Sequence, residues 1–232
     1  METFDRGDSL NAIAILSSMK SEERKALAGG CSWKNFFDKQ VVFDKESDNC
    51  DVMFVVRGKV NVTDYSLTGK EVSFAEIKEG DYFGEIAAID GEPRSASVIA
   101  VGDCELAGLN PSRFRELLDQ HPEISRKVMK RLNSIIRRSN ERVMDLSTLN
   151  ACQRICSEIL RMAKPDTAVA SAWSIYPLPT QAKIASRVSV SRETVARVFK
   201  DLINGGVISK KGRSVFIPDR DKLELLIKRL EN

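Results

Sequence analysis

Phe83-Gly84-Glu85-Ile86-Ala87-Ala88-Ile89-Asp90-Gly91-Glu92-Pro93-Arg94-Ser95-Ala96-Ser97-Val98 is the most informative stretch of this 232-residue chain. Gly84 lets the backbone approach a ligand because it has no side chain, and residues 86–89 can form one helical turn whose free N–H groups suit an anion. Arg94 offers a planar fork of donors for two phosphate oxygens, and Ser95 adds a hydroxyl. Glu85 does not suit a phosphate, but its carboxylate can accept from a ribose hydroxyl. The stretch therefore predicts a cradle for a nucleotide.

The same residues resemble a known family. Phe83-Gly84-Glu85, followed by Pro93-Arg94-Ser95-Ala96, is similar to the phosphate-binding cassette of cyclic-nucleotide-binding domains. The glycine-punctuated pattern over residues 51–81 resembles the β-roll of that domain. Over residues 10–220 the chain resembles the cyclic AMP receptor branch of the Crp–Fnr superfamily. The ligand-binding residues expected from the cradle and from this resemblance are Gly84, Glu85, Ile86, Ala87, Arg94, Ser95, Ser139 and Asn140.

The chain departs from the family at the residues expected over the nucleobase. The family has a Thr-Ser pair on the long helix, whereas this chain has Ser139-Asn140. An amide can donate to guanine or accept from adenine. We therefore expect cyclic AMP as the effector ligand and cyclic GMP as a second ligand, with affinities within about tenfold because one exchanged hydrogen bond changes little free energy. The alternative is that Asn140 faces solvent or a second protomer.

The sequence leaves three other interpretations open. A Gly-Glu pair or an arginine near a proline is common on protein surfaces, so a purely structural roll is one alternative, although the joint pattern favours a ligand site. A regulator of the same family that responds to redox state or another effector is the second. The resemblance makes it less favoured, because no cysteine cluster precedes Cys31 and haem ligands are missing. A nucleotide-handling enzyme is the third. His121 is the only histidine, so we expect neither catalysis nor a metal site.

The cysteines do not suggest a disulfide framework. The chain has five of them, and an odd number in a protein expected to be cytoplasmic argues against structural disulfides. Cys152 and Cys156 are one helical turn apart and could share a helix face. Two small buried apolar residues are the favoured interpretation.

Composition and charge place the chain among globular nucleic-acid-binding proteins. Apolar residues make up 42% and charged residues 30%, and neither a membrane-spanning run nor a signal peptide is evident. We therefore expect a cytoplasmic protein without membrane contact. Residues 151–232 hold 15 basic and 8 acidic residues, whereas residues 1–150 hold 21 and 25. A basic C-terminal part beside an acidic N-terminal part is typical of a DNA-binding domain attached to a different domain.

The periodicity predicts an α+β fold with three parts. These are a cyclic-nucleotide-binding antiparallel β-roll over residues 1–122, a long dimerisation helix over 123–149 and a winged helix-turn-helix domain over 150–232. Residues 10–28 have helical periodicity, and residues 33–109 alternate in short runs broken by glycines. A helix starts at Pro111 and ends at His121-Pro122. Residues 153–163 predict a further helix, and residues 167–179 predict a looser segment.

The long helix carries an apolar stripe. Its members recur at spacings of three and four, flanked by charged residues, which favours a two-stranded coiled coil and a homodimer. The predicted stripe is Val128, Leu132, Ile135, Ser139, Val143, Leu146 and Leu149. Packing of the helix against the roll is the alternative.

Residues 180–217 predict the DNA-binding unit. Thr180 can cap one helix and Ser191 a second, whose sequence Ser-Arg-Glu-Thr-Val-Ala-Arg-Val resembles the recognition helix of the cyclic AMP receptor family. Arginine pairs with guanine and glutamate accepts from cytosine in the major groove. Residues 207–217 predict a hairpin with a basic tip, the wing, which contacts phosphates. The expected DNA-binding residues are Thr180, Gln181, Ser191, Arg192, Glu193, Thr194, Arg197, Lys200, Lys211 and Arg213.

Together these features predict a transcription regulator that binds palindromic promoter DNA as a dimer when a cyclic nucleotide is bound. Double-stranded promoter DNA and a second copy of the chain are the expected partners. The resemblance adds RNA polymerase as a third, although residues 167–179 carry no motif for that contact.

Overall fold

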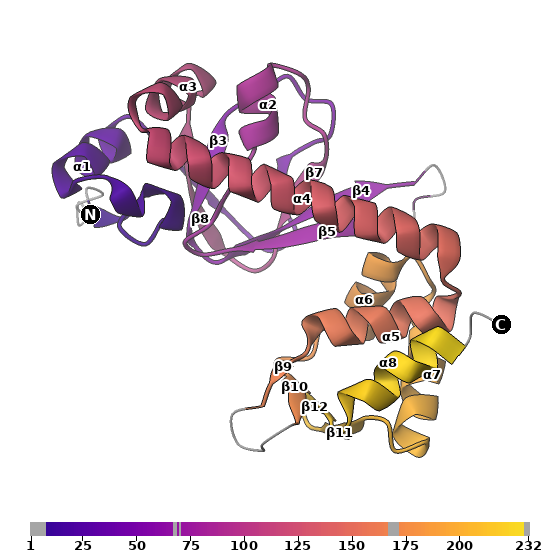
Figure 1. The fold of residues 1–232 in the computed structure, drawn as a ribbon. Helices are drawn as coiled ribbons and strands as arrows, with labels where there is room; N and C mark the ends of the chain where they lie inside the picture. The colour runs from indigo at the N-terminus through magenta and orange to yellow at the C-terminus, as the bar shows by residue number, and fades with distance from the viewer. Residues whose placement is uncertain (1–7, 67–68, 70, 167–171, 230–232) are drawn as a thin grey trace. The chain divides into compact units, whose positions relative to one another are not determined.

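A computed structural model describes residues 8–66, 69, 71–166 and 172–229 (Figure 1). The chain divides into two compact units, residues 1–134 and 135–232. The boundary falls within the long helix α4 (Pro122–Thr148). Each unit is described by itself.

The first unit is built around a roll of antiparallel strands. Within the described residues, one four-stranded sheet has the order β1 (Ser32–Phe36), β8 (Cys104–Leu109), β3 (Val52–Arg57), β6 (Tyr82–Phe83). The other has the order β2 (Val41–Phe43), β7 (Ser97–Ala100), β4 (Lys59–Tyr65), β5 (Glu71–Lys78). Buried side chains from both sheets form one core inside the roll; among them are Phe43, Val55, Val60, Phe83 and Leu106.

Helices pack against this roll. They are α1 (Ser21–Gly29), α2 (Glu85–Asp90), α3 (Pro111–Gln120) and the first part of α4 (Figure 1). The segment predicted to be helical over residues 10–28 contains two helices. A 3-10 helix (Ala14–Ser18) precedes α1, and Lys20 between them has an extended backbone. The Glu23 carboxylate accepts from the Lys20 N–H at 2.9 Å, so the chain starts a new helix here.

Pro122 separates α3 from α4, as predicted. It is also the first residue of α4, because proline is tolerated where an N–H has no helical acceptor. On the roll-facing side of α4, Ile124 and Val128 are buried with Phe114 of α3 in the second core of this unit. The predicted stripe is therefore partly wrong, since Val128 packs inside the first unit.

The second unit contains the end of α4, α5 (Ala151–Met162), α6 (Gln181–Val188), α7 (Arg192–Asn204) and α8 (Arg220–Arg229). Within the described residues, a four-stranded sheet has the order β11 (Ser209–Lys211), β12 (Ser214–Ile217), β10 (Trp173–Ile175), β9 (Lys164–Pro165). The segment predicted to be loose thus contains β10, and its residues 167–171 lie outside the described ones. Together with the roll and α4, this unit confirms the predicted α+β fold.

The two predicted helix caps are present. The Thr180 hydroxyl accepts from the Lys183 N–H at 3.2 Å, and the Ser191 hydroxyl accepts from the Thr194 N–H at 3.2 Å. Both bonds satisfy N–H groups that have no acceptor inside the helix. These caps fix where α6 and α7 begin and hence which side of α7 faces outward.

The turn between α6 and α7 predicts a stabilising substitution. Ser189 has φ +55° and ψ 44°, the left-handed region. This conformation costs a residue with a Cβ about 1–2 kcal/mol. Glycine avoids that cost but destabilises the protein by about 0.4–1 kcal/mol, because it increases the conformational entropy of the unfolded chain. Ser189→Gly should therefore raise the free energy of unfolding by about 0.5–1 kcal/mol in urea titrations. Ser189→Ala, which keeps the Cβ, is the control; equal stability of both variants would contradict the prediction.

Candidate functional site

The predicted cradle is centred on the tight turn before α2. Gly84 has φ +90°, and a Cβ added there would lie 2.7 Å from both Arg94 Nη1 and Asp51 O. Only glycine fits this position without displacing its neighbours. The turn brings Glu85 and Arg94 to the start of α2, where Ala87 is buried and Ile86 is 39% exposed. Ser95 is exposed beside them.

Arg94 is held inside the roll. Its side chain is 4% exposed, Nη1 donates to Gly84 O at 3.0 Å, and Nη2 donates to Asn49 Oδ1 at 2.9 Å and to Asp51 O. Its Cζ lies 3.6 Å from the centre of the Phe43 ring. Burial lowers the pKa of Arg94, yet an arginine remains charged at neutral pH. The buried Nε has no hydrogen-bond partner, so one N–H donor of the guanidinium is unused.

Two residues that contact Arg94 were not predicted from the sequence. Phe43 provides the ring on which the guanidinium stacks. Asn49 Oδ1 accepts from both Arg94 and the Asp51 N–H, the latter at 3.0 Å. Asn49 thereby forms an Asx turn and orients Arg94 at the same time. The local sequence does not relate these residues to Arg94, because Phe43 and Asn49 lie 51 and 45 positions before it in the chain.

Glu85 is a second buried charge in the cradle. It is 4% exposed, and its Oε1 lies 3.3 Å from Arg131 Nε on α4. Arg131 Nε has no hydrogen bond of acceptable geometry, so this contact is an ion pair only. The other Arg131 nitrogens are bound to Asp81 Oδ1 at 2.8 Å and Tyr82 O at 2.7 Å. The Glu85 carboxylate therefore keeps acceptor capacity while Arg131 supports its charge.

Ser139 and Asn140 are exposed on α4 and belong to the second unit. Their contact with a nucleobase stays a prediction. The exposure of Asn140 is compatible with the alternative that it faces solvent or a second protomer.

The outward face of α7 carries most of the residues predicted to contact bases. Arg192, Glu193, Arg197 and Lys200 are exposed, and Thr194 is half-buried with its hydroxyl 3.0 Å from that of Ser191. Hydrogen bonding to its own backbone N–H and to Ser191 lowers the pKa of Glu193, so its carboxylate is an acceptor at neutral pH. The inward face is buried in the core of the unit and consists of Val195, Val198, Phe199 and Leu202.

Comparisons with known proteins identify two domain families in the chain. Residues 33–121 match the family described as cyclic nucleotide-binding domain, and residues 153–226 match the Crp-like helix-turn-helix domain. The cAMP-activated global transcriptional regulator CRP of Salmonella typhimurium is 30% identical over 165 residues, which cover 71% of this chain and 79% of CRP. The chain belongs to the Crp–Fnr family. It is a transcription regulator with an effector domain, in a family that is not enzymatic.

Two further relatives extend this comparison of the Crp–Fnr regulator. The cAMP-activated global transcriptional regulator Vfr of Pseudomonas aeruginosa is 27% identical over 210 residues, covering 88% of this chain and 98% of Vfr. A solved structure of a CooA variant from Carboxydothermus hydrogenoformans has a TM-score of 0.78 at 18% identity, covering 94% of this chain and 95% of CooA. At that identity the likeness shows the fold. None of the described helices is long and apolar enough to cross a membrane.

The long helix of this Crp–Fnr regulator has an exposed apolar seam, which we define as Met129, Ile136, Val143 and Leu146. Their exposed fractions are 54%, 57%, 62% and 49%. Spacings of seven, seven and three place them on one side of a helix, as a coiled coil requires. This seam replaces the predicted stripe, of which it keeps only Val143 and Leu146.

The end of α4 is bound to the helix-turn-helix motif within the second unit. Arg142 Nη2 donates to Arg187 O at 2.8 Å, and Arg154 Nε donates to Val188 O at 3.1 Å. Both acceptors are carbonyls at the C-terminus of α6, where helical donors are missing. The sequence did not predict these two contacts, because the partners of Arg142 and Arg154 are 45 and 34 residues away.

Two of the cysteines, Cys104 and Cys156, are buried, and Cys31, Cys50 and Cys152 are half-buried. Burial raises the pKa of Cys156 to about 12 and that of Cys31 to about 11. Both thiols are therefore protonated at neutral pH, which makes them poor nucleophiles. Cys156 is a core residue as predicted, whereas Cys152 is only half-buried and packs against the same core.

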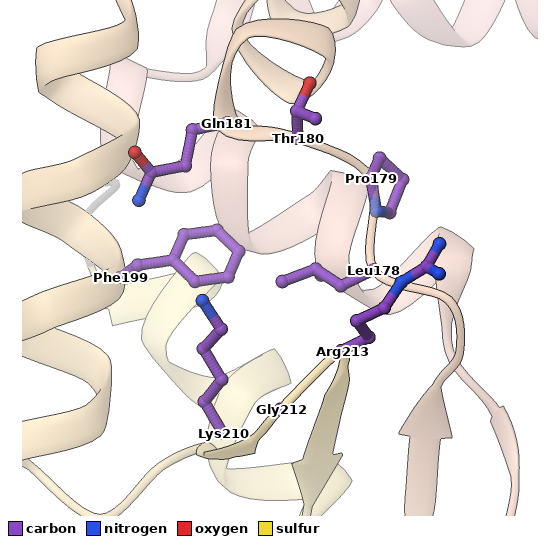
Figure 2. A pocket seen from close by; sticks show the side chains of 8 residues that line it. All are labelled: Leu178, Pro179, Thr180, Gln181, Phe199, Lys210, Gly212 and Arg213. Carbon is purple, nitrogen blue, oxygen red and sulfur yellow. The ribbon is translucent and has the colours of Figure 1, made fainter.

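The hairpin of β11 and β12 places Lys210, Lys211 and Arg213 at the surface. A pocket opens between this wing, the start of α6 and α7 (Figure 2). Thr180, Gln181 and Arg213 of the predicted DNA-binding set line it, whereas Lys211 does not. The structure thus brings three residues of the predicted DNA-binding set together with Lys210, which belongs to the predicted basic tip of the wing.

Proposed function

We propose that this Crp–Fnr regulator binds cyclic AMP, with cyclic GMP as a second ligand, in the cradle around Gly84. The observation that supports it best is the pair of buried charges with unused hydrogen-bonding capacity. Arg94 keeps its Nε–H, and Glu85 keeps carboxylate acceptors. Burying a charge costs free energy unless it is paired, and a purely structural roll has no need of these two groups. A phosphate and a ribose hydroxyl would complete their hydrogen bonding.

The relatives support the same ligand class. CRP and Vfr are each described as cAMP-activated. Ser139 and Asn140 are the proposed nucleobase contacts, in place of the family's Thr-Ser pair. We assign residues 1–122 to the sensor, 123–149 to the dimerisation helix and 150–232 to DNA binding.

Calorimetric titration of the full chain with cyclic AMP, cyclic GMP, cyclic di-GMP and ATP tests this proposal. We expect the two cyclic mononucleotides to bind with affinities within about tenfold of each other, and ATP and cyclic di-GMP to bind far more weakly. If cyclic di-GMP bound and neither cyclic mononucleotide did, cyclic di-GMP would be the effector in place of cyclic AMP. No binding of any nucleotide would overturn the assignment.

We propose further that the ligand controls DNA binding through α4. The recognition helices of a dimer must be spaced by one turn of DNA, about 34–36 Å. The end of α4 is hydrogen-bonded to the last turn of α6 through Arg142, and α6 packs against α7, so a change in the pairing of two α4 helices would move both recognition helices. Fluorescence anisotropy with labelled operator DNA, with and without saturating cyclic AMP, measures the effect. Equal operator affinity in both conditions would refute it.

The exposed seam of α4 predicts a homodimer. Ile136→Glu should produce monomers, because two copies would each lose about 1.5–3 kcal/mol of apolar burial and place a charge in the interface. Met144→Glu is the matched control, since Met144 is 59% exposed on the same helix but lies outside the seam. Sedimentation velocity distinguishes the two states. A dimeric Ile136→Glu variant would contradict the assignment.

A further inference from the structure

A row of charged side chains runs along one side of α5 in the second unit. Arg154, Glu158 and Arg161 are spaced by four and three residues, so they lie on the same side of the helix. Ile155 and Ile159, on a neighbouring side, are fully buried in the core of the unit. The charged row lies where α5 meets the end of α4 and the last turn of α6 (Figure 1).

Glu158 is the carboxylate at the centre of this row, and its side chain is 12% exposed. Its Oε1 accepts from Arg187 Nη1 of α6 at 3.1 Å, and its Oε2 lies 3.6 Å from Arg161 Nη1. Arg142 of α4 belongs to the same cluster. Burial lowers the pKa of Arg142, and the charge of Glu158 opposes this shift. Arg161 and Arg187 lower that pKa further through their like charges. One carboxylate thus acts on three arginines from three helices.

The three arginines are held close together although their charges repel. Arg142 Nη2 donates to the carbonyl of Arg187 at 2.8 Å, which brings the end of α4 against α6. Asp145 of α4 is paired with Arg161 and supports that arginine from the other side. Like charges at this separation repel strongly in a half-buried site unless a carboxylate is shared among them. The negative charge of Glu158 therefore stabilises the contact between α4 and α6.

Movement of α6 reaches the recognition helix α7 through the core. Ile184 of α6 and Val195 of α7 are fully buried in the same cluster. The Val190 N–H donates to Ala185 O at 3.1 Å across the turn between the two helices. Because cores are close-packed, α6 and α7 move together. The end of α4 is thus connected to the base-contacting face of α7 by the ion pairs of Glu158 and then by apolar packing.

We propose that Glu158 is a positioning residue that clamps the end of α4 to α6, so that a change in the pairing of two α4 helices reaches α7. The inference rests on the proposed control of DNA binding by a cyclic nucleotide and names the side chain through which α4 acts on the helix-turn-helix motif. Glu158 acts through Arg142 and Arg187 and lies outside the cradle and the outward face of α7. Its replacement should therefore uncouple the two sites while each still binds its own ligand.

Two glutamate variants in the same unit test the clamp. Glu158→Gln removes the shared charge, whereas Glu224→Gln removes an ion pair with Arg220 inside α8, at 2.8 Å in the structure, and leaves the clamp intact. Fluorescence anisotropy gives the operator affinity of each full-length variant with and without saturating cyclic AMP. The ratio of the two affinities should fall by about 2- to 30-fold in Glu158→Gln and stay at the wild-type value in Glu224→Gln. Calorimetric affinity for cyclic AMP without DNA should match wild type in both. A Glu158→Gln variant that loses affinity equally in both conditions would have a structural role only, which would overturn the proposal.

Hydrogen exchange of the nucleotide-free chain tests the clamp without the ligand. Amides in the last turn of α6 should exchange about fivefold faster in Glu158→Gln than in wild type or Glu224→Gln, because a hydrogen bond to a charged acceptor is stronger than one to a neutral acceptor. Unchanged exchange would overturn the clamp even if wild type responded to cyclic AMP. If exchange rose but wild type bound the operator equally with and without cyclic AMP, the proposed gating would be refuted and Glu158 would be reduced to a structural contact.

Discussion

Replacing Arg94 with alanine should abolish stabilisation by cyclic nucleotide. Arg94 is the buried cation of the cradle and keeps a free Nε–H. Losing a charge-assisted contact at a desolvated site costs about 2–5 kcal/mol, which corresponds to a loss of affinity of at least ~30-fold. Isothermal titration and thermal melting with saturating cyclic AMP measure both effects. Unchanged affinity in Arg94→Ala would remove the basis for the phosphate assignment.

Two further variants separate ligand contact from folding. Arg94 also bonds to Gly84 O, Asn49 Oδ1 and Asp51 O, so its removal affects the roll. Arg94→Lys keeps the charge without the planar fork and should recover part of the affinity. Asn49→Ala keeps the guanidinium but removes one of its hydrogen-bond acceptors. The loss of affinity for cyclic AMP should therefore be smaller than in Arg94→Ala. Urea unfolding without ligand gives the cost in stability of each variant.

The second large effect is expected on α7. Arg192→Ala and Arg197→Ala should each relax the choice of base at one position per half-site, because both side chains are exposed on the outward face of α7. A bidentate contact to guanine gives about 1–3 kcal/mol of discrimination, roughly 5- to 150-fold. The measurement compares binding to a palindrome with TGTGA-like half-sites and binding to scrambled DNA of the same length.

Lys211→Ala is the control for these variants. Lys211 is exposed on the wing, where we expect it to contact only the DNA backbone, so its loss should weaken binding to operator and to scrambled DNA by similar factors and leave the specificity ratio unchanged. If Arg192→Ala and Lys211→Ala gave the same specificity ratio, α7 would not read bases through Arg192.

Some features of this regulator follow from neighbouring residues. Gly84 was predicted to form a turn before a short helix, and it does so in a left-handed conformation, whereas its approach to a ligand stays a prediction. Thr180 and Ser191 were predicted as caps and form those hydrogen bonds. The alternation of buried and exposed residues along α7 also follows from helical period. Interactions over three to four residues depend on local sequence alone, which explains why the predicted caps and the predicted period of α7 were confirmed.

Other features depended on the tertiary structure. The partners of Arg94 and Glu85, namely Asn49 and Arg131, are each about 45 residues away in the chain, and no periodicity relates them. The face of Lys210 was decided by its register with Val215. Val128 of the predicted stripe is absent from the seam of α4 because it is buried in a core of the first unit. The sequence by itself determined the order of elements, the caps and the cradle turn; packing between distant segments decided which charges are buried, which lysine lines the pocket and which apolar side chains remain exposed.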